Sequence, residues 1–117
     1  MTRPRILVVE DETLMAIVLE SMIFEHVRQA DVVVTPTVAS AEHALLHPYF
    51  DFAFLDVNLT DGKSYRIAEI LQDHGVPFAF ISGISRDKDM PARLRNVPFI
   101  PKPYQSSQVT DLLRKLA

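Results

Sequence analysis

Five polar side chains stand where apolar segments of the sequence end. Glu10 and Asp11 follow "RILVV", and Asp56 closes "FAFLD". Ser82 follows "FAFI", and Lys102 follows "PFIP". If these apolar segments are parallel strands of one open sheet, their carboxyl ends meet at a single edge, where such sheets bind ligands. We therefore expect the five side chains to line one pocket.

The charges in this pocket require a cation. Three carboxylates in one cleft repel one another, and Lys102 opposes them with a single positive charge. Carboxylate oxygens suit a hard divalent cation, most naturally Mg²⁺, for which Mn²⁺ can substitute. Mg²⁺ keeps several waters and prefers to share a phosphate ligand. A metal, a lysine and a hydroxyl around Asp56 are the groups needed to transfer a phosphoryl group onto a carboxylate.

Strand-like segments alternate with segments of helical spacing, and this order must position the five side chains. The strands are apolar on both faces, which is typical of a parallel sheet covered by helices on both sides. Right-handed crossovers leave few topologies, so we expect a flavodoxin-like (βα)5 doubly wound sheet with strand order 2-1-3-4-5. The expected strands are 5–10, 31–35, 52–55, 78–81 and 97–100, and the first three expected helices are 14–26, 41–45 and 64–73. A last helix is expected from an apolar stripe formed by Val109, Leu112, Leu113 and Leu116.

Three of the helical segments carry more specific expectations. Ser40 is predicted to be the N-cap of the second helix. The segment 85–96, "SRDKDMPARLRN", has a proline in its middle and few large apolar residues, so the fourth helix should be short or mobile. In the first helix, residues at i, i+4 spacing predict one buried apolar face. These residues are Leu14, Met15, Val18, Leu19, Met22 and Ile23.

Composition excludes several classes of function. A net charge of -3 argues against nucleic-acid binding by this chain, because phosphate contacts need a basic surface. The lack of cysteine excludes disulfides, thiolate metal sites and cysteine catalysis, and fits a reducing compartment. No apolar run approaches the ~20 residues of a membrane span, and the N-terminus lacks a signal-peptide pattern. We therefore expect a cytoplasmic protein without a membrane segment.

Four motifs, "VVEDE", "FLDVNLTDG", "FISG" and "PFIPKPY", occur in an order that resembles the CheY-like receiver domain of bacterial two-component response regulators. The resemblance covers residues 1–117 and implies a single receiver domain with no output domain. It implies that Asp56 accepts a phosphoryl group from a histidine kinase or a phosphotransfer protein. It also implies that Asp11 binds Mg²⁺ directly, that Glu10 binds it through water, and that Asn58 offers its backbone carbonyl.

The same resemblance assigns roles to the other end of the pocket. Ser82 would hydrogen-bond the phosphoryl oxygen, and Lys102 would pair with it. The bond between Lys102 and Pro103 would be cis, as in many members of the family. Phe99 occupies the aromatic switch position, and without a tyrosine hydroxyl its movement would be purely steric. The switched surface, formed by the fourth helix, the fifth strand and the last helix, would bind a downstream protein or a second copy of the chain.

The motifs "FISGIS" and "PFIPKPY" are also similar to a subfamily of single-domain receivers from alphaproteobacteria. That subfamily carries a Phe-Ala-Thr-Gly-x-Tyr motif and has a poorly ordered fourth helix. In this sequence Ser85 stands in the place of the tyrosine.

Other functions remain open beside a phospho-accepting receiver. The chain could bind proteins without being phosphorylated, or be a receiver cut from a larger regulator or hybrid kinase. A phosphatase of the haloacid dehalogenase type also uses a strand-end aspartate, but it needs a general acid two residues later, where this chain has Asn58. We therefore expect no enzyme activity beyond the phosphorylation and dephosphorylation of the chain itself.

Overall fold

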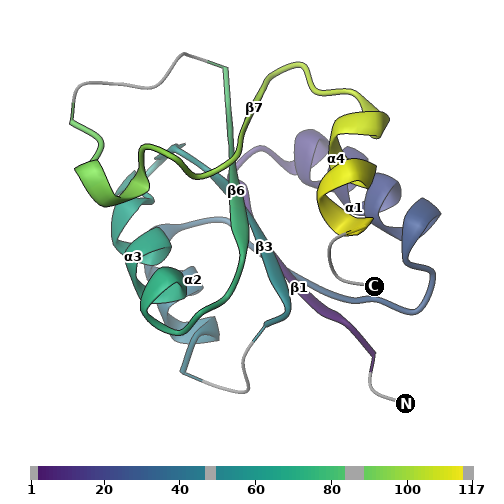
Figure 1. The fold of residues 1–117 in the computed structure, drawn as a ribbon, viewed down its shortest axis with the longest axis horizontal. Helices are drawn as coiled ribbons and strands as arrows, with labels where there is room; N and C mark the ends of the chain where they lie inside the picture. Colours follow the sequence, from purple (N-terminus) through teal and green to yellow (C-terminus); the bar gives the residue numbers. More distant parts are fainter. Residues whose placement is uncertain (1–2, 47–49, 84–88, 115–117) are drawn as a thin grey trace.

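The computed structural model describes residues 3–46, 50–83 and 89–114. A parallel five-stranded sheet runs through the middle of the molecule, with helices on both faces (Figure 1). Its strands lie in the spatial order β2-β1-β3-β6-β7, which confirms the predicted flavodoxin-like order 2-1-3-4-5. The strands are β1 (Arg5–Val9), β2 (Asp31–Thr35), β3 (Phe52–Asp56), β6 (Phe78–Ser82) and β7 (Phe99–Pro101).

Helices α1 (Thr13–His26) and α4 (Ser106–Leu113) cover one face of the sheet, and α2 (Val38–Ala44) and α3 (Tyr65–Asp73) cover the other. A short antiparallel pair, β4 (Asn58–Leu59) and β5 (Gly62–Lys63), follows β3. A 3-10 helix, η1 (Ala92–Leu94), precedes β7. None of the described helices is long and apolar enough to cross a lipid bilayer.

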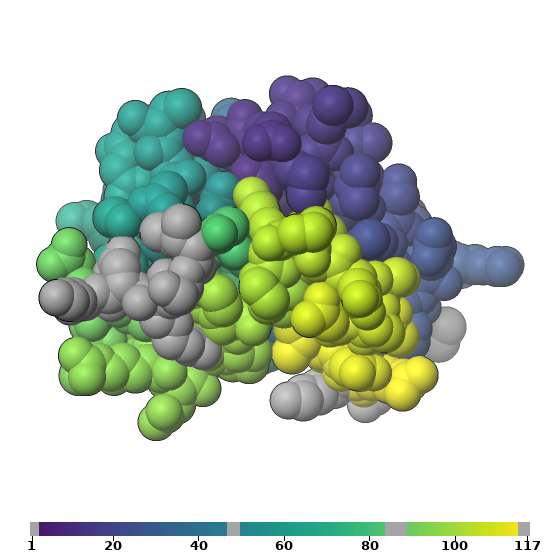
Figure 2. All heavy atoms as spheres, turned by 90° about the horizontal axis from the view of Figure 1, so that it is seen from above, coloured from purple at the N-terminus to yellow at the C-terminus, as the bar shows by residue number. Residues whose placement is uncertain are grey.

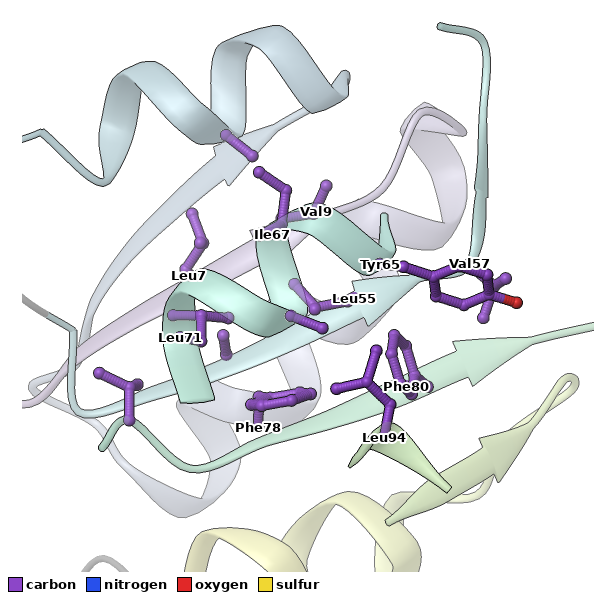
Figure 3. Close-up of a cluster of buried hydrophobic side chains, with 14 of the residues drawn as sticks. Leu7, Val9, Leu55, Val57, Tyr65, Ile67, Leu71, Phe78, Phe80 and Leu94 are labelled. Atoms are coloured by element: carbon purple, nitrogen blue, oxygen red, sulfur yellow. The ribbon is translucent and has the colours of Figure 1, made fainter. Parts of the chain in front are cut away.

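The central strands are apolar on both faces, and each face supplies a separate core. Every residue of β3 and β6 is buried, as expected for strands with helices above and below them. Successive side chains of β1 point to opposite faces, so Leu7 and Val9 join one core and Ile6 and Val8 the other. Figure 3 shows the core under α3, where side chains from β1, β3, β6 and η1 meet.

The prediction of which face of α1 is buried is wrong in part. Leu14 and Val18 are exposed, at 72% and 42%, and the fully buried side consists of Ala16, Leu19 and Ile23. The predicted Met15, Leu19, Met22 and Ile23 do contact the core on this face of the sheet. The helix is apolar on nearly all sides, so its spacing could not determine which side faces the sheet.

The start of α2 and the start of the last strand also differ from the prediction. The N-cap of α2 is Thr37, and Ser40 is the third residue of the helix. The Thr37 side chain accepts a hydrogen bond from the Ser40 backbone N–H, and the Ser40 side chain accepts one from Thr37 N–H, each at 3.0 Å. The last strand begins at Phe99 because Val97 N–H donates to Leu94 O in the turn of η1, and Pro98 has no N–H to donate.

The segment 85–96, predicted to hold a short or mobile fourth helix, is described only in part. Its described residues, 89–96, contain the 3-10 helix η1 and no α-helix, while 85–88 lie outside the described residues. Arg93 of η1 reaches α3, where its Nη2 lies 2.6 Å from Asp73 Oδ1. Leu94 is buried in the core below (Figure 3).

Candidate functional site

The carboxyl ends of β1, β3, β6 and β7 bring the predicted site residues to one edge of the sheet. Asp56 ends β3 and pairs with Ile81 of β6, and Ser82 pairs with Pro101 of β7. Figure 2 looks onto this edge, where the segments after β1 (purple), β3 (teal) and β7 (yellow-green) lie side by side. The strand order therefore brings polar residues from four parts of the chain to one edge of the sheet.

Glu10, Asp11 and Asp56 form a carboxylate cluster, which we call the acid cluster. One oxygen from each lies within 4.8 Å of the other two. Glu10 and Asp56 are buried, and Asp11 is half-buried. Carboxylates this close and this poorly hydrated repel one another strongly, so the cluster favours any cation that reaches it.

Lys102 supplies one positive charge to the acid cluster. Its Nζ donates hydrogen bonds to Glu10 Oε1 at 2.7 Å and to Asp56 Oδ2 at 3.2 Å. The lysine side chain is 18% exposed. On the backbone, Lys102 N–H donates to Ser82 O at 2.8 Å, which attaches the end of β7 to β6. The peptide bond between Lys102 and Pro103 is cis.

The pKa values of Glu10 and Lys102 are both raised. Burial raises the pKa of Glu10, and the hydrogen bond from Lys102 lowers it less than burial and the charge of Asp56 raise it. Burial lowers the pKa of Lys102, but the hydrogen bond to Glu10 and the charge of Asp56 outweigh burial and raise it. The negative charge of Asp56 contributes to both shifts, although burial is the larger cause of the Glu10 shift, and a divalent cation would offset that charge.

The residues present fit a hard divalent cation such as Mg²⁺. The acid cluster offers carboxylate oxygens, the ligands that Mg²⁺ prefers, and the nearest basic group carries one charge against three. That Asp11 and Asp56 hold the metal directly, and Glu10 through water, stays a prediction from the resemblance. Asn58 lies in β4, two residues after Asp56, and the role of its backbone carbonyl as a further ligand also stays a prediction.

Ser82 and Phe99 lie at opposite ends of neighbouring strands. Ser82 is buried at the end of β6, between the strand of Asp56 and the segment of Lys102. Phe99 opens β7, pairs with Phe80 of β6 and packs partly buried against the core under α3. The serine therefore lies at the acidic edge, and the partly buried aromatic ring lies farther from that edge, against the core that also contains Leu94 of η1.

Two residues that the sequence reasoning missed also connect segments near the site. Tyr104 Oη donates to Met15 O in α1 at 3.0 Å. Burial and the charge of Glu10 raise the Tyr104 pKa to about 12. Asp61, in the turn between β4 and β5, accepts hydrogen bonds from Val38 N–H at 2.8 Å and Ala39 N–H at 3.1 Å, which lower its pKa. The "KPY" and "TDG" motifs contained both residues, but not their distant partners.

No known family model matches the sequence, and no curated protein matches it. Solved structures do match. SdrG from Sphingomonas melonis Fr1 is 37% identical, with 99% of this chain and 98% of SdrG covered at a TM-score of 0.80. The non-phosphorylated HemR receiver domain from Leptospira biflexa is 28% identical, with 97% and 94% covered at a TM-score of 0.79. The response regulatory domain of mrkE from Klebsiella pneumoniae is 27% identical, with 96% and 93% covered at a TM-score of 0.81.

The five-stranded parallel sheet with an acid cluster at its carboxyl edge defines an α/β domain of the flavodoxin-like class. Within that class, these similarities in sequence and fold show that the chain belongs to the CheY-like receiver domains of response regulators. Membership in the subfamily with the Phe-Ala-Thr-Gly-x-Tyr motif stays a prediction. Its distinguishing position, Ser85, lies outside the described residues.

Proposed function

We propose that the chain is a phospho-accepting signalling domain and that Asp56 is its acceptor. One observation carries this proposal: the Asp56 carboxylate lies within 4.8 Å of Glu10 and Asp11 oxygens and 3.2 Å from the Lys102 ammonium. A carboxylate is a poor nucleophile toward an anionic phosphoryl group unless positive charge offsets the repulsion. Lys102 supplies part of that positive charge, and the acid cluster would supply the rest by holding a divalent cation.

The phosphoryl donor is a phosphohistidine on a histidine kinase or a phosphotransfer protein. An oxygen of Asp56 attacks the phosphorus, the bond from phosphorus to the donor's imidazole nitrogen breaks, and that nitrogen keeps the electron pair. Bound Mg²⁺ supplies positive charge that offsets the phosphoryl oxygens. The Lys102 ammonium, which already contacts Asp56, pairs with one of these oxygens. The Ser82 hydroxyl donates to another, since Ser82 ends β6, the strand next to that of Asp56. The chain promotes its own phosphorylation and dephosphorylation and no other reaction.

The added phosphoryl group changes the surface around η1, β7 and α4. It carries about -1.5 to -2 charge and three acceptor oxygens. Drawing Ser82 toward the phosphoryl group leaves space for Phe99, and the ring's movement reshapes that face. A downstream protein or a second copy of the chain binds there. The reaction takes place in the cytoplasm, where the donor is phosphorylated.

The phosphoryl donor docks on an exposed apolar surface beside the acid cluster. This surface, the α1 patch, consists of Leu14, Ile17, Val18 and Val34. Ile17 and Val34 line a hollow of about 280 Å³ whose wall also includes Glu10 and Asp11. A partner seated on the α1 patch therefore reaches the acidic edge of the sheet.

Charge indicates which kind of partner fits the α1 patch. Residues 10–27 contain five carboxylates and no lysine or arginine. Two copies of α1 would place like charges together, whereas a helix with an apolar face and a basic rim would complement the surface. We therefore assign the α1 patch to the phosphodonor protein and the face formed by η1, β7 and α4 to the output.

A small phosphodonor such as acetyl phosphate, added with Mg²⁺, tests the function without the unknown kinase. Intact mass spectrometry should show the gain of one phosphoryl group by the wild-type chain, and hydroxylamine should remove it, since acyl phosphates are labile. Asp56→Asn should remain unmodified under the same conditions. An unmodified wild-type chain with correctly folded NMR signals would contradict the proposal and favour a binding module that works without phosphorylation.

A further inference from the structure

Tyr104 occupies a position between the two charged segments of the site. It follows Lys102 by two residues, its side chain is buried, and its ring belongs to the core under α1 and α4. Its hydroxyl donates to Met15 O at 3.0 Å, across 89 positions of sequence. Met15 lies in the first turn of α1, directly after the segment that carries Glu10 and Asp11. The hydrogen bond therefore joins the lysine segment to the acid segment.

The two segments are joined at two points. The first is the contact between Lys102 Nζ and Glu10 Oε1, at 2.7 Å. The second is the contact between the Tyr104 hydroxyl and Met15 O. A lysine side chain has four rotatable bonds, so its ammonium stays at one position only if the backbone that carries it is held. The backbone of Lys102 is attached to β6 through Ser82 O, and Tyr104 attaches the same segment to α1.

Packing alone does not account for the hydroxyl. A buried hydroxyl costs free energy unless it is hydrogen-bonded, and a phenylalanine ring would fill the same apolar core without that cost. The contribution of the Tyr104 hydroxyl therefore comes from its hydrogen bond to Met15 O.

We propose that the Tyr104 hydroxyl is a positioning group, which holds Lys102 within the acid cluster by fixing the lysine segment against the first turn of α1. The inference rests on the proposed function, since the value of a fixed Lys102 lies in phosphoryl transfer to Asp56. Tyr104 touches neither the acid cluster nor the reacting atoms by any described hydrogen bond, so it acts through Lys102.

This role predicts opposite effects on metal binding and on phosphoryl transfer. Lys102 contacts Glu10 and Asp56, two of the carboxylates that would hold Mg²⁺. The lysine ammonium and Mg²⁺ would therefore repel each other and compete for these carboxylates. Loosening Lys102 leaves Mg²⁺ binding unchanged or tighter, because a competing positive charge is less firmly held. It slows phosphoryl transfer, because the same charge no longer stands ready for the phosphoryl oxygens. General damage to the site would weaken both.

The test compares wild type, Tyr104→Phe, Lys102→Ala and the double variant. Amide NMR signals near Asp11 and Asp56 report Mg²⁺ affinity, and mass spectrometry reports the rate of modification by acetyl phosphate. We expect Tyr104→Phe to slow modification about three- to tenfold, which corresponds to the free energy of one lost hydrogen bond. The Kd of this variant for Mg²⁺ should be equal to or below that of wild type. In the Lys102→Ala background, Tyr104→Phe should change neither value, since the group it positions is gone.

Tyr65→Phe is the matched control, because it removes a buried tyrosine hydroxyl on the other face of the sheet. It should leave the modification rate unchanged. A Tyr104→Phe chain that reacts as fast as wild type would overturn this inference and leave the proposed function intact. So would parallel weakening of both Mg²⁺ binding and modification, or an equal loss with and without Lys102. A wild-type chain that forms no adduct would overturn the proposed function, and this inference with it.

Discussion

The ammonium of Lys102 lies 2.7 Å from a carboxylate oxygen of Glu10, a residue 92 positions earlier in the chain. Although this is a close, largely buried ion pair, the pKa of Glu10 is raised. Burial and the charge of Asp56 together outweigh the lysine. Three carboxylates face this one ammonium, so the stability of the site should depend on both pH and divalent cations.

The first prediction concerns Glu10→Gln, which removes one buried charge from the acid cluster. Because the pKa of Glu10 is raised on folding, its contribution to stability is complete below its usual pKa and is lost as the pH rises through the raised value. Without metal, the free energy of unfolding of wild type should therefore fall relative to that of Glu10→Gln as the pH rises above the usual glutamate pKa of about 4. Urea unfolding at several pH values measures this difference.

Magnesium should reverse this difference in stability, so that wild type becomes more stable relative to Glu10→Gln. A ligand that binds the folded state stabilises it by RT ln(1 + [L]/Kd), and Glu10→Gln removes one of the groups that attract Mg²⁺. Excess Mg²⁺ should raise the melting temperature of wild type more than that of the variant. An equal rise in both proteins would show that Glu10 takes no part in holding the metal.

The second prediction concerns alkaline pH and Tyr104. Its pKa is raised to about 12, so the folded chain keeps the proton on the phenol after the unfolded chain has lost it. The stabilisation is complete below the usual tyrosine pKa of about 10 and disappears as the pH rises to about 12. The stability advantage of wild type over Tyr104→Phe should therefore shrink across this range. Tyrosinate absorbance of both proteins would locate the titration, and a Tyr104 that ionises near pH 10 in the folded chain would contradict the prediction.

The sheet and the acid cluster could be predicted because both depend on local patterns. Strands apolar on both faces specify a covered parallel sheet, and polar residues such as Asp56 and Lys102 at strand ends identify the edge where chemistry gathers. No long-range information was needed to expect that Glu10, Asp11 and Asp56 would meet.

The contacts that could not be predicted join segments distant in sequence or depend on a choice between equivalent residues. Tyr104 and Met15 are 89 positions apart, and nothing in either local sequence identifies the other. Thr37 and Ser40 both carry hydroxyls that take part in one capping box, so residue type did not show which of them begins α2. Apolar residues lie on most sides of α1, so the sequence did not determine which side of the helix faces the sheet.

The third prediction concerns Asp61, which accepts hydrogen bonds from the first N–H groups of α2. A carboxylate in this position stabilises a helix start. Because those hydrogen bonds lower its pKa, its contribution is present above its usual pKa and is lost as the pH falls through the lowered value. Asp61→Ala should lower the melting temperature at neutral pH and lower it less in strong acid.

Asp111→Ala is the control for Asp61→Ala, because Asp111 is exposed and pairs at 3.6 Å with Arg114 on its own helix. Such surface pairs contribute little, so the melting temperature should hardly change. NMR titration should find the Asp61 carboxyl below the usual aspartate value. A normal Asp61 pKa, or equal effects of the two substitutions, would show that Asp61 does not stabilise α2.

The last prediction separates docking from chemistry. Ile17 lies in the α1 patch, 52% exposed, and lines the hollow that also contains Glu10 and Asp11. Ile17→Ser should slow phosphoryl transfer from a phosphorylated donor protein about tenfold or more, the effect of removing a central apolar contact from an interface. Modification by acetyl phosphate should keep its wild-type rate, because the acid cluster and Lys102 are unchanged.

Leu46→Ser provides the matched control, since Leu46 is 77% exposed and lies outside the α1 patch. It removes a comparable apolar side chain and should affect neither donor. Equal loss with both donors in Ile17→Ser would mean that the substitution damages the site itself. If the protein donor reacts normally with Ile17→Ser and with Val18→Ser, the donor docks elsewhere, and the exposed apolar residues of α1 must face a different partner.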